Sequence, residues 1–160
     1  MQDPNKILIP VRNSDDLVEV LVSELPEDVE DVIEILVAEV APLELWLRFA
    51  VEYYRQGRLD SFVGMLNPLV ELHSEPSQTG ASSKLFEQFG GAAEVKEQFL
   101  EILNALAAFH TVLGMRERDK FKKKGEFDQA KRFYDQAEQV GPCRCRRHCR
   151  SRARCCRVVT

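Results

Sequence analysis

Residues 41–62 read Ala-Pro-Leu-Glu-Leu-Trp-Leu-Arg-Phe-Ala-Val-Glu-Tyr-Tyr-Arg-Gln-Gly-Arg-Leu-Asp-Ser-Phe, and this stretch decides the fold. Four residues in it recur at the spacing of one helix face: Trp46, Phe49, Ala50 and Tyr53. Gly57 can adopt the left-handed backbone conformation that ends a helix, and a second apolar face begins at Leu59. The stretch therefore predicts two helices, near 43–56 and 59–67 or beyond, joined by a glycine turn.

This spacing is typical of a tetratricopeptide repeat, in which Trp46, Ala50, Tyr53 and Gly57 would be the repeat-packing positions. Two short amphipathic helices cannot bury their apolar faces alone, so further helices must stack on them. The predicted fold class is therefore mainly α, with tetratricopeptide-like helical hairpins that begin an α-solenoid.

A second set of repeat positions follows along the chain: Leu106, Ala107, Gly125, Ala130, Tyr134, Ala137 and Pro142. We expect helices near 94–114 and 126–140, with Gly125 turning the chain and Pro142 ending the unit. The basic run 115–124 would then be an insertion that forms a solvated turn between the two helices. His110 takes an aromatic position of the repeat, which favours a packed, hydrogen-bonded histidine over a catalytic one.

The flanking segments predict smaller elements. Residues 6–12 and 17–22 favour a short β-hairpin or an extended segment, which either covers the first helices or is offered to a partner. Apolar spacing over 28–40 predicts an amphipathic helix. Pro68 should kink the following helix or end it near Leu66 or Asn67. Residues 73–92 read as a flexible loop, with His73 at the surface. The expected division is 1–26, a helical domain 27–142, and a disordered tail 143–160.

The charge is unevenly distributed over the 160 residues. The last twenty residues hold seven of the 22 basic residues and none of the 26 acidic ones, which leaves a net charge of −11 in residues 1–140. That body should repel nucleic acid phosphates. The five cysteines all lie in the tail and form no C-x-x-C pair, so we expect no metal site, and we expect the tail to lie outside the repeat family. No apolar run is long enough to span a bilayer, so no membrane partner is expected.

Several stretches carry a family resemblance: Ile9-Pro10-Val11-Arg12-Asn13, Glu24-Leu25-Pro26, Val32-Ile33-Glu34-Ile35-Leu36, Ala41-Pro42-Leu43-Glu44-Leu45-Trp46, Glu52-Tyr53-Tyr54-Arg55-Gln56-Gly57 and Leu103-Asn104-Ala105-Leu106-Ala107-Ala108-Phe109. In their order and spacing, residues 7 to about 140 resemble the N-terminus of the large tetratricopeptide scaffold subunit of the RNA polymerase-associated factor (PAF) complex. The resemblance implies a nuclear, non-enzymatic scaffold without cofactor or small-molecule substrate. Its partners would be other subunits of the complex, RNA polymerase II through the complex, and chromatin indirectly, in support of transcription elongation and histone modification.

Two other functions remain open from the residues alone. A generic repeat adaptor would clamp a peptide or chaperone tail with cationic side chains, for which the first repeat helix offers Arg48 and Arg55. A nucleic-acid binder would use the basic run 115–124 and the tail, against the acidic body. An enzyme is disfavoured, because the sequence shows no phosphate-binding loop, no metal pair and no nucleophile beside a base.

Overall fold

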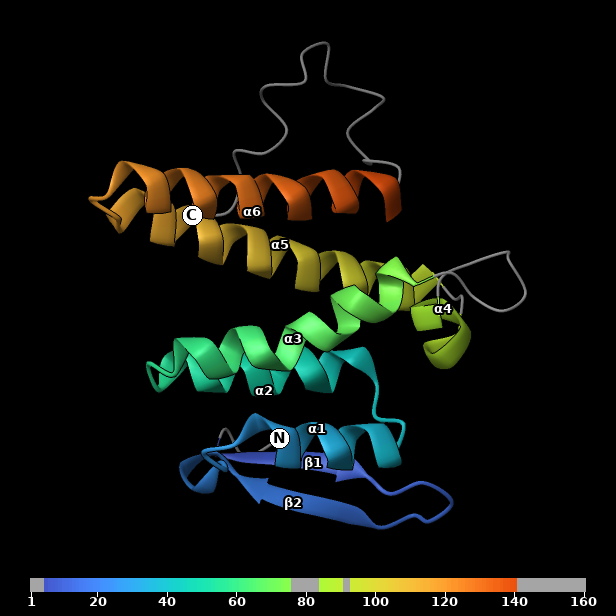
Figure 1. The fold of residues 1–160 in the computed structure, drawn as a ribbon. Coiled ribbons are helices and arrows are strands. Elements are labelled where there is room, and N and C mark those ends of the chain that lie inside the picture. Colours follow the sequence, from blue (N-terminus) through green and yellow to red (C-terminus); the bar gives the residue numbers. More distant parts are fainter. Residues whose placement is uncertain (1–4, 76–83, 91–92, 141–160) are drawn as a thin grey trace. The chain divides into compact units, whose positions relative to one another are not determined.

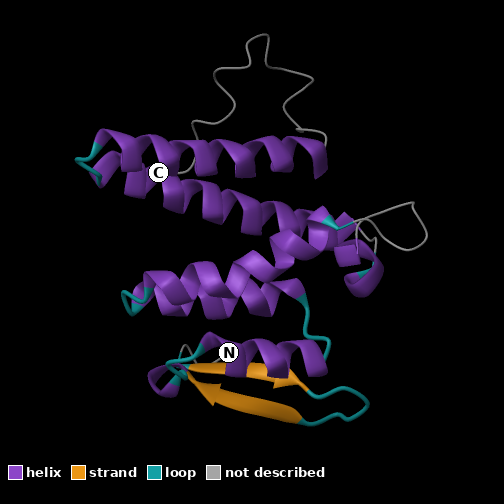
Figure 2. Ribbon diagram, viewed as in Figure 1, coloured by secondary structure: helices purple, strands orange, loops and turns teal. Residues whose placement is uncertain are grey.

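The computed structural model describes residues 5–75, 84–90 and 93–140. Its elements run in the order β1 (Lys6–Pro10), β2 (Leu17–Leu21), the 3-10 turn η1 (Val22–Glu24), α1 (Val29–Ala38), α2 (Leu43–Arg55), α3 (Leu59–Ser74), α4 (Lys84–Phe89), α5 (Ala93–Arg116) and α6 (Lys120–Val140) (Figure 1). Figure 2 shows that the regular elements of the described chain are helices, joined by loops, apart from one two-stranded sheet. The predicted mainly α class with helical hairpins is confirmed.

The chain divides into two compact units, Met1–Ile102 and Leu103–Thr160. Helix α5 crosses the boundary, so its first part belongs to one unit and its second part to the other. The predicted division into 1–26, 27–142 and 143–160 stays a prediction. Pro142, the tail 143–160 and half of the expected loop 73–92 lie outside the described residues. The described half of that loop includes the end of α3 and the short helix α4.

The N-terminal hairpin is the β-hairpin that the sequence favours. Strands β1 and β2 pair antiparallel, with Ile7 opposite Val20 and Ile9 opposite Val18. Both isoleucines are fully buried, whereas Val18 on β2 is partly exposed. The Arg48 guanidinium of α2 donates to the Lys6 carbonyl at 3.0 Å, which fastens β1 to the helices. A hairpin of this size needs such a covering surface to be stable in water.

Helix α1 begins and ends at recognisable signals. The Asp28 side chain accepts a hydrogen bond from the Glu30 amide at 3.0 Å and so caps the helix. At the other end the Ala41 amide donates to Leu36 O and the Val40 amide to Val37 O, the pattern of a Schellman motif. Val40 has a φ of 49°, a left-handed conformation that a β-branched residue rarely adopts. The same motif ends α2, but there Gly57 takes the left-handed position with a φ of 77°.

This comparison yields a prediction for the end of α1. Val40→Gly should raise the free energy of unfolding by about 1 kcal/mol, because glycine carries no Cβ penalty in the left-handed region. Gly57→Ala, the opposite change at the matching position, should lower it by about the same amount. Urea denaturation of the two variants and the parent would measure both shifts. A loss of stability in Val40→Gly would contradict the strain assigned to Val40.

The α2–α3 hairpin forms the core of the first unit. Its buried side chains come from both helices: Leu43, Trp46, Phe49, Ala50, Tyr53, Phe62, Met65, Leu66 and Leu69. Helix α3 does not end near Leu66 or Asn67, so that part of the expectation for Pro68 is wrong. The helix continues to Ser74 because buried residues on both sides of the proline hold it in the core, and Figure 1 shows it bending along its course.

The second half of α5 and helix α6 form the hairpin of the second unit. Their turn is much shorter than the sequence suggests, because α6 begins at Lys120 and not near residue 126. Asp119 caps this start: its Oδ1 accepts from the amides of Phe121 at 2.8 Å and Lys122 at 3.2 Å. Glu117 Oε1 accepts from the amides of Arg118 and Asp119. The expected long insertion is therefore mainly the first turn of α6.

Helix α5 also requires a correction about membranes. By length and composition alone, its 24 residues are sufficient to cross a bilayer, although the core helix of a soluble protein meets the same criterion. One side of α5 is fully buried within the protein: Phe99, Ile102, Leu103, Leu106 and Ala107. The apolar character of the helix therefore has an explanation in packing.

Candidate functional site

The residues predicted to pack the first repeat all belong to the α2–α3 hairpin. Trp46, Ala50 and Tyr53 are buried on one face of α2, and Gly57 lies in the turn that follows. Ala50 and Tyr53 are fully buried. Their assignment as repeat positions stays a prediction, but the hairpin that the assignment presupposes is present.

Arg58, directly after the turn, connects this hairpin to the segment before α1. Its guanidinium donates to the carbonyls of Pro26 at 2.6 Å and Glu27 at 2.5 Å, and more weakly to Leu25 at 3.4 Å. It also lies 4.5 Å from the centre of the Tyr53 ring, a cation–π arrangement. One side chain thus satisfies several carbonyls at once, which the planar fork of arginine allows. We refer to Arg58 and Tyr53 with these carbonyls as the Arg58 clamp.

Tyr53 completes the Arg58 clamp. Its hydroxyl donates to the Pro26 carbonyl at 3.1 Å. Burial raises the pKa of Tyr53 above its ordinary value, while the nearby Arg58 cation acts in the opposite direction. The phenol therefore remains a proton donor at neutral pH. The repeat pattern identifies Tyr53 only as an apolar residue, and it gives no indication that Arg58 has a structural role.

The second hairpin brings together most of its predicted repeat residues. Leu106 and Ala107 on α5 are fully buried, and Ala130 on α6 is nearly so. Tyr134 is 37% exposed and Ala137 is half-buried. In the described part of the chain no later helix follows α6 to cover them.

His110 is the packed, hydrogen-bonded histidine that the sequence favours. Its Nδ1 lies 2.7 Å from Glu126 Oε2, which joins α5 to α6. Its ring stacks on Phe133 with the centroids 5.6 Å apart. A second ring contact is with Phe109, at 5.3 Å between the centroids. All of these partners belong to the hairpin, so His110 is part of its packing.

Gly125 does not turn the chain, contrary to the prediction. It lies inside α6, its side of the helix is exposed, and an added Cβ would meet nothing within 4 Å. The glycine with a packing role is Gly114 in α5, where an added Cβ would lie 3.0 Å from the Phe127 ring. The basic residues before Gly125 are typical of a solvated turn, but Asp119 caps them as the first turn of α6.

These two glycines give a matched pair of predictions. Gly125→Ala should stabilise the protein by about 0.5–1 kcal/mol, because alanine favours an exposed helix interior. Gly114→Val should destabilise it by about 1–3 kcal/mol, because the new side chain overlaps the Phe127 ring. Thermal melts of both variants would test this. If Gly125→Ala destabilised the protein, Gly125 would have to lie in a turn and not inside a helix.

His73 is not the isolated surface residue that the sequence suggests. It is half-buried in an aromatic cluster, 4.6 Å from the Phe99 ring and 5.5 Å from the Phe86 ring by centroids. Phe86 belongs to α4, and Leu85 beside it is fully buried. His73 continues the buried face of α3 one turn beyond Leu69, and this spacing is the sequence signal that could have identified it.

Burial lowers the pKa of His73 below its ordinary value. The unfolded chain, with an ordinary histidine pKa near about 6.5, therefore binds the proton more readily than the folded one. The free energy of unfolding should be fully retained above about pH 6.5 and should decrease as the pH falls through the lowered folded pKa.

We therefore expect His73→Phe to be less sensitive to acid than the parent. The difference in melting temperature between the two proteins should widen in favour of the variant from about pH 7.5 to about pH 5.5, where most carboxylates are still ionised. Differential scanning calorimetry at both pH values measures it. Parallel pH profiles would show that His73 titrates as freely in the fold as in the unfolded chain.

The described residues show no arrangement suited to metal chemistry. Within residues 5–75, 84–90 and 93–140, no group of three histidine, aspartate or glutamate side chains could hold a metal ion. All five cysteines lie outside those ranges. Some polar contacts of the described chain instead join one helix or segment to another, as in the Arg58 clamp and the His110–Glu126 pair.

Comparison with known proteins gives consistent relatives. The chain is 37% identical over 134 residues to "Protein CTR9 homolog" of Arabidopsis thaliana, an alignment that covers 84% of this chain and 11% of the relative. It is 34% identical over 142 residues to "RNA polymerase-associated protein CTR9" of Caenorhabditis elegans, covering 88% of this chain and 11% of the relative. No family model matches the chain. The resemblance inferred from the sequence is confirmed, and it applies to about a tenth of the length of these relatives.

Proposed function

We propose that this chain, which is similar to one segment of the CTR9 proteins, is a non-enzymatic interaction scaffold of the PAF transcription elongation complex. It would act in the nucleus with RNA polymerase II and support co-transcriptional histone modification. Its partners would be other subunits of the complex, with RNA polymerase II and chromatin reached through them. The observation that carries the proposal is the similarity to two CTR9 proteins over more than four-fifths of the chain, one of which is named as RNA polymerase-associated.

The helical hairpins support the scaffold part of this proposal. Stacked helix pairs present extended surfaces, and proteins built from them commonly bind other proteins. Large apolar side chains in and just after α1 are also partly exposed, namely Ile35, Val37 and Val40. Such side chains suit contact with other protein surfaces more than they suit water.

The generic adaptor function has less support. A clamp for a peptide carboxylate needs free cationic side chains along the inner helices. Arg48 donates to the Lys6 carbonyl, and Arg55 pairs with Glu52 at 2.6 Å. Arg48 and Arg55, the two arginines that could have bound a peptide carboxylate, therefore both contact other groups of this chain.

Co-purification from nuclear extract tests the proposal. The tagged full chain should recover other PAF subunits and RNA polymerase II, identified with antibodies to each. Gly125→Ala is the matched control, because it changes an exposed helix position and should not reduce folding. The Trp46→Ala variant should recover neither the other PAF subunits nor RNA polymerase II, because it lacks the side chain at the centre of the first unit. A folded chain that recovers none of them would contradict membership of the complex.

A further inference from the structure

The turn between α5 and α6 carries an unusual surface. Six basic residues fall within nine positions: Arg116, Arg118, Lys120, Lys122, Lys123 and Lys124. All six are exposed, and among them lie the two most exposed large apolar side chains of the described chain, Phe121 at 89% and Met115 at 69%. We name residues 115–124 the basic tip. It contrasts with the net charge of −11 that residues 1–140 carry as a whole.

The carboxylates within the basic tip do not neutralise it by contact. Glu117 Oε1 accepts from two backbone amides, and Asp119 Oδ1 accepts from two others. Both acidic side chains are therefore engaged in capping the turn and α6. In the part of the chain that the structure describes, none of the six basic side chains forms an ion pair. The basic tip thus offers a set of unpaired cations.

The placement of these cations opposes folding. Lys120 and Lys122 occupy the first turn of α6, which contains no acidic residue. Cations are unfavourable there, because the N-terminus of a helix carries a partial positive charge. Lys120 and Lys124 also form a like-charged pair one turn apart, which destabilises a helix further. A surface that lowers the stability of its own helix is better explained by an interaction with another molecule than by a role in the fold.

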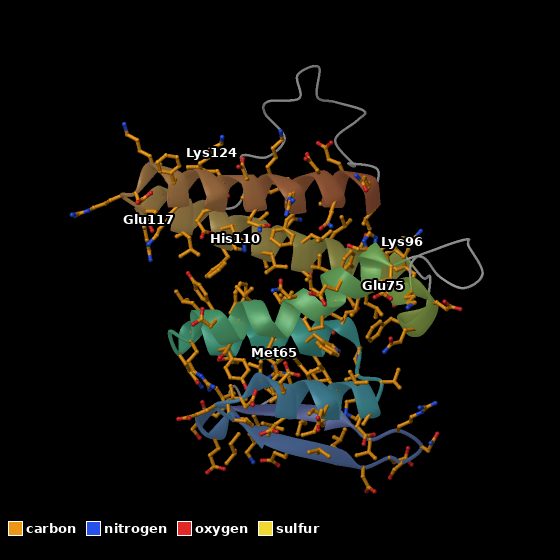
Figure 3. The ribbon with its side chains drawn as sticks, viewed as in Figure 1. Met65, Glu75, Lys96, His110, Glu117 and Lys124 are labelled. Atoms are coloured by element: carbon orange, nitrogen blue, oxygen red, sulfur yellow. The ribbon has the colours of Figure 1, made fainter. Side chains whose placement is uncertain are left out.

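Phe121 lies on the side of α6 that faces away from α5. Helix α6 meets α5 through Glu126, Ala130 and Phe133, and by helical spacing Phe121 and Lys124 fall on the opposite side. Figure 3 shows Lys124 projecting from that outer side of α6, while Glu117 lies at the turn. An apolar ring and flanking ammonium groups are therefore presented together to solvent.

We propose that the basic tip is a docking surface for an acidic peptide segment that carries an apolar residue. The carboxylates of the segment would pair with the lysines and arginines, and its apolar residue would cover Phe121 and Met115. Complementary charge would set the orientation and speed of association, and the buried ring would contribute to affinity. This inference deepens the proposed scaffold function, on which it rests, by naming the chemistry of one partner.

A protein segment fits this surface better than a nucleic acid does. Nucleic-acid grooves follow a strand with several stacking rings along a positive path. The basic tip has one exposed ring, and the net charge of −11 over residues 1–140 disfavours association with a phosphate backbone. A short acidic peptide makes all its contacts within the basic tip.

Fluorescence anisotropy with the full chain tests the proposal. The probe is a short labelled peptide of Glu and Asp around a single Leu. The comparison probes replace Leu by Ser, or replace the peptide by a single-stranded oligonucleotide of equal charge. We expect the Leu peptide to bind about tenfold more tightly than the Ser peptide and the oligonucleotide. Its affinity should fall as salt shortens the screening length below about 10 Å.

Three variants locate the binding. Lys120→Glu should weaken the Leu peptide about tenfold, and Phe121→Ser should abolish its advantage over the Ser peptide. Lys131→Glu makes the same change in charge at an exposed position about three turns further along α6 and should leave affinity within about twofold. Lys120→Glu should also raise the melting temperature or leave it unchanged, because it places an acidic residue in the first turn and pairs it with Lys124.

Several outcomes would overturn the proposal. Tighter binding of the oligonucleotide would assign the surface to nucleic acid. If neither Lys120→Glu nor Phe121→Ser weakened binding of the Leu peptide, the peptide would be bound by the arginines of residues 141–160 and not by the basic tip. A lower melting temperature in Lys120→Glu would show that the cations serve the fold. Because these measurements use defined probes, their failure would leave the co-purification test of the scaffold function unaffected.

Discussion

Trp46→Ala should lose about 3–5 kcal/mol of folding free energy, which is most of the stability of a small domain of about 5–15 kcal/mol. Trp46 is the largest side chain of the core and only 2% exposed. It lies on the face of α2 that also carries Phe49, Ala50 and Tyr53, so its removal leaves a cavity at the centre of the first unit. Urea denaturation followed by far-ultraviolet circular dichroism would measure the loss.

Two controls define what the Trp46 result means. Val37→Ala truncates a side chain that is 48% exposed on α1 and should change stability by about 0.5 kcal/mol or less. Trp46→Phe should cost clearly less than Trp46→Ala. In the described chain the buried Nε1 of Trp46 has no hydrogen-bond partner, so the indole contributes through its apolar surface. A Trp46→Ala variant that unfolds at the same denaturant concentration as the parent would contradict the claim that the α2–α3 hairpin supplies most of the stability of the first unit.

Arg58→Ala should lose about 2–3 kcal/mol, the second largest effect that we expect. The change removes the hydrogen bonds to the carbonyls of Pro26 and Glu27 and exposes the Tyr53 ring on one side. The carbonyls that remain would be only partly resolvated, because Pro26 and Leu25 are not fully exposed. The chevron plot of the variant would show whether the Arg58 clamp forms before or after the main folding transition.

Two variants provide the comparison for Arg58→Ala, one at the nearby Arg55 and one that replaces Arg58 by lysine. Arg55→Ala removes a side chain that is 68% exposed and pairs with Glu52 on the same helix, and it should change stability by about 0.5 kcal/mol or less. Arg58→Lys keeps the charge but cannot contact several carbonyls in one plane, so it should recover only part of the loss. Full recovery with lysine would show that charge alone, and not the planar fork, stabilises this junction.

The parts of the fold that follow local rules were predictable. The apolar spacing around Trp46 predicted α2, and the left-handed turn at Gly57 predicted its end. The apolar spacing over residues 28–40 predicted α1, which Asp28 caps in the structure. The sequence favoured a short β-hairpin or an extended segment over residues 6–12 and 17–22, and the structure has the hairpin, with Ile7 and Ile9 buried.

Local sequence rules failed at residues of the fold where a local preference is opposed by capping or by burial. Gly125 follows a basic run and so resembles a turn glycine. The Asp119 cap, however, starts α6 at Lys120, so Gly125 lies inside the helix. Pro68 disfavours a helix locally, but the burial of Met65 and Leu69 outweighs that preference. The role of Arg58 depends on contacts with carbonyls about thirty residues away, which no local spacing encodes. The burial of His73 was open to prediction from its spacing after Leu69, but its contact with the Phe99 ring was not. The assignment of repeat positions stays a prediction, and of the polar groups that join the helices the sequence indicated His110 but not Arg58.

One small contact has a consequence for how this chain can vary. The Lys84 amide donates to the Glu75 carbonyl at 3.1 Å, and the two side chains form an ion pair. The two positions are thereby held together regardless of what lies between them. Closing a longer connection costs only about 0.6 kcal/mol for each doubling of its length. The interval 76–83 is consequently a place where insertions, deletions or a genetically encoded label should be tolerated, so that diversity among related chains can accumulate there at small cost to the fold.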